Sequence, residues 1–247
     1  MDSLEQKLND ALDIGEGLLK SGAEVGRVED TITRILRSQG ADRVDVFTIT
    51  SSIVVTGHFG EEIRTQTRRV REGSYNMTAL TAFNGLSRDL CQGKLTHEDV
   101  AARLQRIAAG PTYGFGISVL CYGMASVAFS LFFGGSFLDA VISGGIGMLI
   151  RLMLWGMNKL QVPGIATTLL CAIVGGFLGH GVMLLGVPCA PGKIAIGNIM
   201  LLVPGIGMTN AIRDMFTGDT ISGLLRFFET LLLGLALAWG FALPSLL

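Results

Sequence analysis

The first 110 residues contain no proline, because all six prolines lie at position 111 or beyond. Charged residues are also unevenly distributed: 30 charged side chains lie in residues 1–110 and nine in residues 111–247. Charged side chains are costly in hydrocarbon, so the pattern predicts a water-soluble domain followed by a membrane domain. Lys plus Arg is 19 and Asp plus Glu is 20, and this balance gives no indication of nucleic-acid binding.

The chain also lacks closely paired cysteines and a secretory signal. Its four cysteines are Cys91, Cys121, Cys171 and Cys189. Their spacing predicts neither a disulfide framework nor a metal site, and we expect small buried apolar side chains. No cofactor is predicted. The first residues, MDSLEQKLND, have no basic or apolar signal region, which predicts a cytoplasmic N-terminus.

Residues 1–110 show two hydrophobic periodicities. Apolar residues recur at helical spacing over 4–19 and again from Val25 to Leu36. β-Branched residues in RVDVFTITSSIVVTGH (43–58) predict two strands, and EIRTQTRRV (62–70) a third. Helical spacing then returns, with Thr96 and Asp99 forming a capping box. The prediction is a cytoplasmic α+β domain of order ααβββαα, long enough to bury its own core.

Nucleophile and base candidates exist in this domain. They are Ser51, Ser52, His58 and His97. No GxSxG turn surrounds the serines, and serine and threonine are common in exposed strands. A structural or regulatory role is therefore favoured over hydrolysis. The basic run RTQTRRVREG (64–73) is typical of a solvated strand, with contact to anionic headgroups as the alternative.

Five transmembrane helices are predicted in residues 111–247, each near the ~20 residues that a bilayer requires. The predicted spans are 113–133, 137–155, 165–185, 194–211 and 221–243. Prolines mark their ends, and Pro204 lies inside the fourth. With a cytoplasmic N-terminus, four basic residues of the connections face inward and one faces outward, which satisfies the positive-inside rule. The odd number of spans predicts an external C-terminus.

Two features of the spans bear on packing and transport. Gly175 and Gly179 form a GxxxG motif, which permits close approach of helices. Pro204 and Gly205 in VPGIG are expected to break the fourth span. Non-helical backbone at membrane depth is tolerated where it is buried in protein or lines a wet cavity, and transporters often bind solutes at such breaks.

Polar residues follow this break within VPGIGMTNAIRDMFTGD (203–219). Asn210 and Asp214 are i,i+4 neighbours, and Arg213 could bind a carboxylate with two hydrogen bonds. An ordinary cytoplasmic helix end is the alternative. Arg226 and Glu229 form an i,i+3 pair in an otherwise apolar span, where charged residues normally face the bundle interior.

Other polar residues of the membrane half are weaker candidates, for which packing is the favoured interpretation. They are Asp139, Arg151, His180 and Asn198.

Several segments together resemble the threonine/serine exporter family, specifically its N-terminal half. They are LLKSGAEVGRVEDTITRI (18–35), VDVFTITSSIVVT (44–56), TRRVREGSYNM (67–77) and LLVPGIGMTNAIRDMFTGDTISGLLRFFE (201–229). The resemblance implies a cytoplasmic domain, five spans and proton-driven export of threonine and serine, in the bacterial inner membrane. Related two-subunit members are associated with succinate export.

The resemblance also implies a partner. Fused members of the family carry a second block of about five spans, which this sequence does not include. We therefore expect a separate small multi-span membrane subunit, with a homo-oligomer as another possibility.

The positions that match the family's motifs suggest a site. In the soluble domain they include Gly22, Glu24, Arg27 and Glu29. In the membrane domain, the chemistry of the side chains gives the hypothesis that Pro204, Gly205, Asn210, Arg213 and Arg226 bind the solute. Asp214 or Glu229 would carry the coupling proton. A membrane-anchored enzyme and a sensor that uses residues 1–110 are the competing functions.

Overall fold

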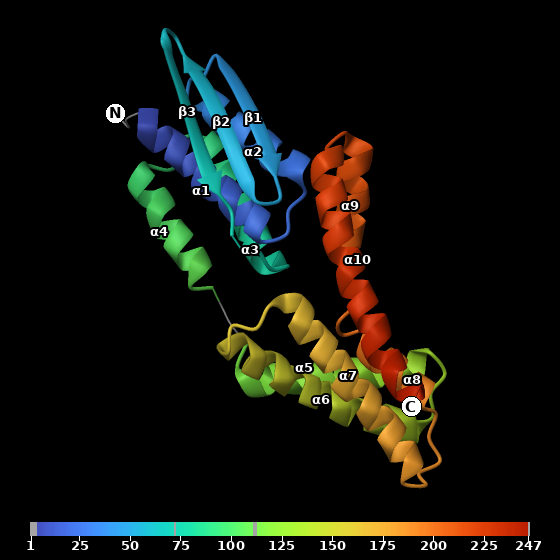
Figure 1. Ribbon diagram of the computed structural model, residues 1–247. Helices are drawn as coiled ribbons and strands as arrows, with labels where there is room; N and C mark the ends of the chain where they lie inside the picture. Colours follow the sequence, from blue (N-terminus) through green and yellow to red (C-terminus); the bar gives the residue numbers. More distant parts are fainter. Residues whose placement is uncertain (1–3, 72, 111–112, 247) are drawn as a thin grey trace. The chain divides into compact units, whose positions relative to one another are not determined.

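The computed structural model describes residues 4–71, 73–110 and 113–246, and it separates into two compact units (Figure 1). One unit contains the first four helices, three strands and residues 206–228. The other contains residues 113–205 and 229–246. The first unit is therefore built from two stretches of sequence, and residues 206–228 belong with the charged N-terminal region.

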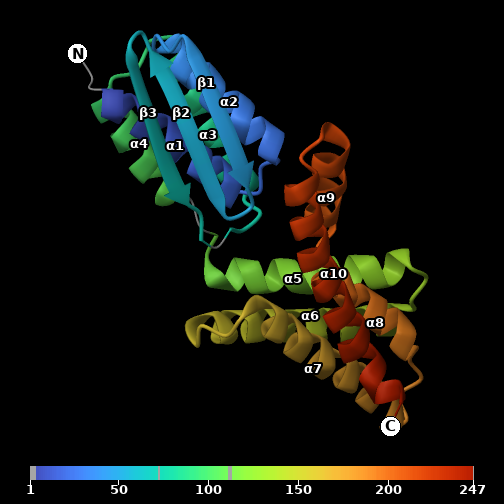
Figure 2. The same cartoon turned by 45° about the horizontal axis from the view of Figure 1, so that its top comes forward.

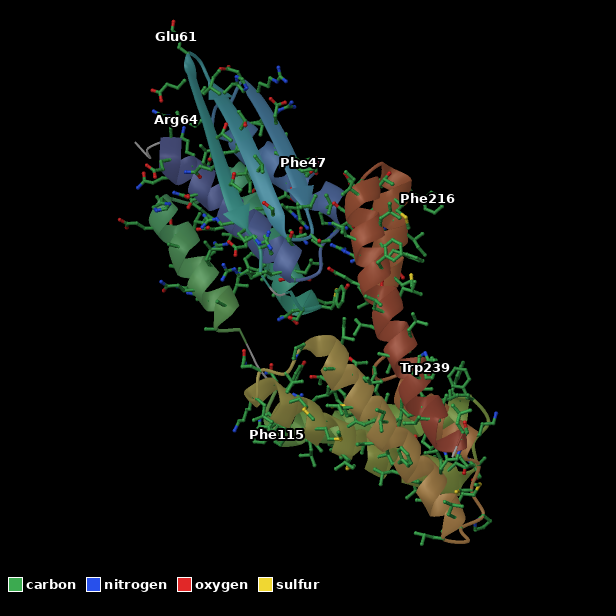
Figure 3. All side chains as sticks on the ribbon, in the orientation of Figure 1. Phe47, Glu61, Arg64, Phe115, Phe216 and Trp239 are labelled. Atoms are coloured by element: carbon green, nitrogen blue, oxygen red, sulfur yellow. The ribbon has the colours of Figure 1, made fainter. Side chains whose placement is uncertain are left out.

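A three-stranded antiparallel sheet forms one face of the first unit. Its strands are β1 (Arg43–Ile49), β2 (Ser52–Phe59) and β3 (Glu62–Arg69), in the order β1-β2-β3. In β2 alternate residues are buried, among them Ile53 and Val55. Figure 2 shows the helices on one face of the sheet. On the other face Phe47, labelled in Figure 3, is 58% exposed.

Four helices lie on the buried side of the sheet. They are α1 (Leu4–Lys20), α2 (Val25–Ser38), α3 (Met77–Cys91) and α4 (His97–Ala108). Helices α1 and α2 contact the strands, and α3 and α4 pack against α1. The predicted apolar stripe of α2 is confirmed, since its valines, isoleucines and leucine between residues 25 and 36 are fully buried. The predicted capping box of Thr96 and Asp99 is also present.

The second unit is a set of apolar helices. They are α5 (Phe115–Phe132), α6 (Phe137–Lys159), α7 (Gly164–Leu184), α8 (Pro191–Ile199) and the end of α10 (Thr220–Ala242) with the 3-10 turn Leu243–Ser245. Among the described residues, four helices have the length and composition to cross a membrane: α5, α6, α7 and α10 with its 3-10 extension. The chain is therefore a multi-pass membrane protein.

A fifth span is not confirmed. The predicted span 194–211 is divided between α8 and α9 (Gly205–Thr217), which have nine and 13 residues. Residues 200–204 between them are not helical. Pro204 has no backbone N–H and disfavours helical geometry in Val203, which explains the break.

Glycines allow the helices of the second unit to approach closely. In the predicted GxxxG motif, an added Cβ would lie 3.2 Å from the Phe241 ring at Gly175 and 3.4 Å from Ile194 at Gly179. Other large apolar side chains of these helices are exposed, and Trp239, labelled in Figure 3, is 65% exposed. Exposed apolar side chains on spanning helices are typical of a lipid-facing surface.

The packing of α1 against α3 gives a first prediction. An added Cβ at Gly17 would lie 2.2–2.8 Å from Phe83 ring atoms. We expect Gly17→Ala to destabilise the protein by about 1–3 kcal/mol, because the ring must move within a packed core. The thermal unfolding midpoint of the purified protein in detergent measures the effect.

Gly85→Ala is the matched control. Gly85 is an exposed α3 residue with nothing within 4 Å of an added Cβ, and alanine favours helix by roughly 1 kcal/mol. We expect its midpoint to be unchanged or higher. Equal midpoints for the two variants would contradict the described contact.

Candidate functional site

The candidate site begins with the helical hairpin of α9 and α10. Gly218 joins the two helices with a φ of +101°, a conformation that favours glycine. At Gly223 an added Cβ would lie 2.8 Å from the carbonyl oxygen of Ala211, so the two helices are in close contact. The hairpin carries Asn210, Arg213 and Asp214 on α9, and Ser222 and Arg226 on α10.

The loop between α1 and α2 supplies the other half of the site. Gly22 has a φ of +91°, and an added Cβ would lie 2.5 Å from Tyr75. Only glycine fits this turn without strain. The turn leaves the carbonyl groups of Gly22 and Ala23 and the first amide of α2, that of Val25, available to residues outside the loop.

Hydrogen bonds join the hairpin to this loop. Asn210 Nδ2 donates to the carbonyl oxygen of Gly22 at 2.9 Å. The Val25 amide donates to Asp214 Oδ1 at 3.2 Å. Arg226 Nη2 lies 3.4 Å from the carbonyl oxygen of Ala23, to which it donates. The structure therefore brings predicted residues from both halves of the sequence into one cluster.

An ion pair lies at the centre of this cluster. Arg226 Nη1 is 3.6 Å from Asp214 Oδ2. Asp214 is fully buried and Arg226 is 8% exposed. The Asp214 carboxylate also lies at the N-terminus of α2, where unpaired amides and the helix dipole favour negative charge. Asp214 thus acts as the cap of α2, in which Glu24 makes no side-chain capping bond.

Burial determines the direction of the Asp214 pKa. Desolvation raises this pKa above the ordinary aspartate value, while Arg226 and the Val25 amide lower it by smaller amounts. The carboxylate is consequently easier to protonate than an exposed aspartate.

Two further contacts surround the central pair. Arg213 forms an ion pair with Glu24, and Arg27 lies 3.9 Å from the same carboxylate. On the other side, Glu29 Oε1 accepts a hydrogen bond from the Thr48 amide at 2.7 Å. Ser222 Oγ donates to the Thr48 carbonyl oxygen at 3.2 Å. Burial raises the pKa of Glu29. The predicted soluble-domain motif therefore holds both the hairpin and the end of β1.

The other predicted residues belong to the second unit. Pro204 and Gly205 lie at the break before α9, in the second unit, and Glu229 is an exposed α10 residue of that unit. Thr48 and Ser222 were not predicted. The only sequence feature that pointed to Ser222 was the Ser-Gly pair at 222–223, since small residues permit close helix contact.

The predicted nucleophiles and bases do not converge. Ser52 and His58 lie at opposite ends of β2, and His58 Nε2 is 3.7 Å from Asp45. His97 Nδ1 is 2.7 Å from Asp10 on α1. Over the described part of the chain, no group of three His, Cys, Asp or Glu side chains could hold a metal ion. This geometry does not favour the hydrolase hypothesis.

Comparison with known proteins identifies the family of this multi-pass membrane protein. Residues 10–245 match the family described as "Putative threonine/serine exporter". The chain therefore belongs to the threonine/serine exporter family, whose members are transporters. No solved structure matches it.

Individual relatives carry two different names. A Klebsiella aerogenes protein named "Probable succinate transporter subunit YjjP" is 28% identical over 90% of this chain and 86% of its own length. Its Escherichia coli namesake is 27% identical over 90% of this chain and 87% of its own length. The Corynebacterium glutamicum "Threonine/serine exporter" is 24% identical over 91% of this chain and 48% of its own length.

The buried ion pair yields a stability prediction. Arg226→Met leaves the buried Asp214 carboxylate without its cationic partner, and losing one member of a buried pair costs about 3–5 kcal/mol. We expect a clear fall in the thermal unfolding midpoint of the purified protein. Asp214→Asn combined with Arg226→Met should recover part of that loss, because the buried charge is then absent.

Arg213→Met provides the control. Arg213 is exposed, and its pair with Glu24 lies at the surface, where ion pairs contribute about 0–1 kcal/mol. If Arg213→Met lowered the midpoint as much as Arg226→Met, the central position assigned to the Asp214–Arg226 pair would be wrong.

Proposed function

We propose that this chain is a subunit of a proton-coupled secondary exporter of small carboxylate-bearing metabolites, with threonine and serine as the first candidates and succinate as the alternative. Membership of a transporter family supports export. The names of the relatives support both solute classes. All of these solutes carry a carboxylate, so the same arginines could serve either class.

The observation that carries this proposal is a carboxylate site occupied by the chain's own Asp214. A helix N-terminus and a guanidinium, the two groups that hold Asp214, are also groups that bind external carboxylates. We propose that the solute carboxylate competes with Asp214 for Arg226, and with Glu24 for Arg213. Asn210 would supply a neutral donor, and the break at Pro204 and Gly205 would let α9 move.

Protonation of Asp214 provides the coupling in this proposal. A proton on Asp214 removes the charge that pairs with Arg226 and frees the guanidinium for the solute. Since burial raises the Asp214 pKa, this exchange occurs at a higher pH than an ordinary aspartate would allow, and falling pH favours it. Glu229 is the second candidate for the proton, on α10 only three residues beyond Arg226.

A second membrane subunit completes the proposed transporter. Two relatives are named as transporter subunits. The C. glutamicum exporter aligns with this chain over 48% of its length, which leaves room in that protein for a further block. A small multi-span partner that supplies a comparable block is therefore proposed, alongside the possibility of a homo-oligomer.

A sensor is the second candidate function. It is favoured by one observation: Asn210, Arg213, Asp214 and Arg226 belong to the unit that contains the sheet. In that case solute bound at the cluster would regulate export without being the transported molecule. Ligand binding that persists when transport is abolished would favour this function.

Export from proteoliposomes tests the proposed function. Vesicles loaded with labelled threonine or succinate are given a proton gradient, with the chain alone or with its candidate partner. We expect gradient-driven efflux only with both subunits. Asp214→Asn should reduce this efflux to the rate seen without a gradient, because the side chain no longer exchanges a proton.

Two further variants belong to the efflux experiment: Asp30→Asn is the control, and Glu229→Gln tests the second candidate for the proton. Asp30 is an exposed α2 residue paired with Arg34, so its amide variant should export normally. Full gradient-driven efflux in both Asp214→Asn and Glu229→Gln would exclude the proposed coupling. Efflux by the chain alone would exclude the requirement for a partner.

Topology is tested separately. We propose a location in the bacterial inner membrane with residues 1–110 in the cytoplasm and, for five crossings, the C-terminus outside. A phosphatase that is active only outside the cell, fused after residue 247, should then be active. Inactivity of this fusion, together with fluorescence of a cytoplasmic reporter fused at the same point, would mean an even number of crossings.

A further inference from the structure

Helices α5 and α6 contact each other along a seam that is polar or small at every fourth residue. Residues four apart lie on one face of a helix, and the two helices run antiparallel, so their stripes meet residue by residue. The α5 stripe is Ser118, Tyr122, Ser126 and Ser130. The α6 stripe is Arg151, Gly147, Ser143 and Asp139, in the order that faces α5. We call this surface, together with Asn198 and Gly197 of α8, the α5–α6 seam.

The middle of the seam is a hydrogen-bonded layer from three helices. The hydroxyl oxygens of Ser126 and Ser143 are 2.7 Å apart. Ser126 Oγ is 3.0 Å from Asn198 Oδ1, and Asn198 Nδ2 donates to Ser143 Oγ at 3.1 Å. All three residues are fully buried. Their donors and acceptors are neutral and can exchange partners at low cost, as transient binding of a polar solute requires.

Charged side chains lie at both ends of the seam. At one end Arg151 Nε donates to Ser118 Oγ at 2.6 Å, and its guanidinium lies 5.5 Å from the centre of the Tyr122 ring. At the other end the Asp139 carboxylate accepts a hydrogen bond from the Ala190 amide at 2.7 Å. Lys193 Nζ donates to the carbonyl oxygen of Phe133, the residue after the end of α5. The Asp139 carboxylate also forms the capping box of α6 with Ser136, so Arg151 and Lys193 are the groups that can attract a carboxylate.

Ser130 is the residue that helix packing does not explain. Its hydroxyl is fully buried and has no hydrogen-bond partner among the described residues. It lies one turn from Ser126 and faces Gly197, whose added Cβ would be 3.1 Å from Ser130 Cβ and 2.4 Å from Ser143 Oγ. An unpaired hydroxyl in an apolar interior costs free energy, so a role only in packing would favour alanine at this position.

The contact between α7 and α10 differs in composition from the seam. Where α7 meets α10, the contact is made by Gly176, Ala172, Gly240 and Phe241. Small and apolar residues are sufficient to pack these spanning helices. The concentration of buried hydroxyl and amide groups at the seam therefore calls for another explanation.

We propose that the α5–α6 seam is the route by which the solute crosses the membrane unit, with Ser126, Ser130, Ser143 and Asn198 as its binding layer. This inference rests on the proposed export function and adds a site that lies outside the Asp214–Arg226 cluster. The solute class is a small carboxylate, and the hydroxyl and ammonium groups of threonine and serine would bind to the hydroxyl–amide layer. Arg151 binds the carboxylate at one end, and the hydroxyl–amide layer replaces its water at the centre.

Thiol labelling tests the seam without depending on the solute. The control protein keeps the native Cys121, which is exposed on another face of α5. Its other three cysteines are replaced by alanine. The test protein differs from the control protein by Cys121→Ala and Ser130→Cys. The second substitution exchanges one oxygen atom for sulfur. Each is treated in proteoliposomes with a small, charged, membrane-impermeant thiol reagent, with and without threonine or succinate.

We expect Ser130→Cys to react, with a reaction slowed by the transported solute, and Cys121 in lipid to remain unmodified. Ser126→Ala with Ser143→Ala should lower efflux by about tenfold or more. Thr167→Val, which removes a buried α7 hydroxyl bonded to its own helix region, should retain efflux within about twofold.

A Ser130→Cys protein as unreactive as Cys121 would overturn the seam as a route, whatever the effect of the alanine variants. Failure of the parent protein together with its candidate partner to export any tested carboxylate would instead contradict the proposed function. Because labelling is read in the absence of solute as well, the two failures are distinguishable.

Discussion

The carboxylate of Asp214 at the first turn of α2 is the contact on which the first unit depends. A buried carboxylate is stable only when its charge is compensated, and here the Val25 amide and Arg226 provide that compensation. The Val25 contact and the bond from Arg226 to the Ala23 carbonyl oxygen attach the α9–α10 hairpin to the N-terminal domain. Stability and hairpin position are therefore linked through one titratable group.

This linkage explains why residues far apart in sequence have matching chemistry. Gly22 forms the turn that presents its carbonyl group, Asn210 binds that group, and Glu24 neutralises Arg213. Substitution of any one of these residues therefore affects the contact between the α1–α2 loop and the α9–α10 hairpin. A change in the protonation of Asp214 would alter this contact without requiring any rearrangement of the sheet core, which is made by other residues.

Much of this arrangement could be predicted from the sequence, because it follows from local rules. The apolar spacing of α2 from Val25 to Leu36 determines its buried face, and Pro204 determines where the helix breaks. The site residues were recognisable from their unusual chemistry in an apolar context. Arg226, for example, lies in a span made almost wholly of Leu, Gly, Ala and Phe.

The partners of these residues could not be predicted, because they depend on tertiary contacts with main-chain groups. Nothing local indicates that Arg226 binds the carbonyl group of Ala23, or that Asp214 caps a helix 189 residues away. The prediction that Arg226 pairs with Glu229 considered only contacts within one helix. For the fourth span, the composition indicated a stretch long enough to cross a membrane. The backbone constraint of Pro204 instead interrupts the helix.

The separation of Val25 and Asp214 also affects how the protein is made. The N-terminal domain leaves the ribosome long before its hairpin exists, and at roughly 5–20 residues per second the separation of 189 residues takes about 10–40 s to synthesise. During that time α2 has no cap from Asp214, while α5, α6 and α7 are inserted into the membrane. Biogenesis of the first unit is thus completed only after most of the second has been synthesised.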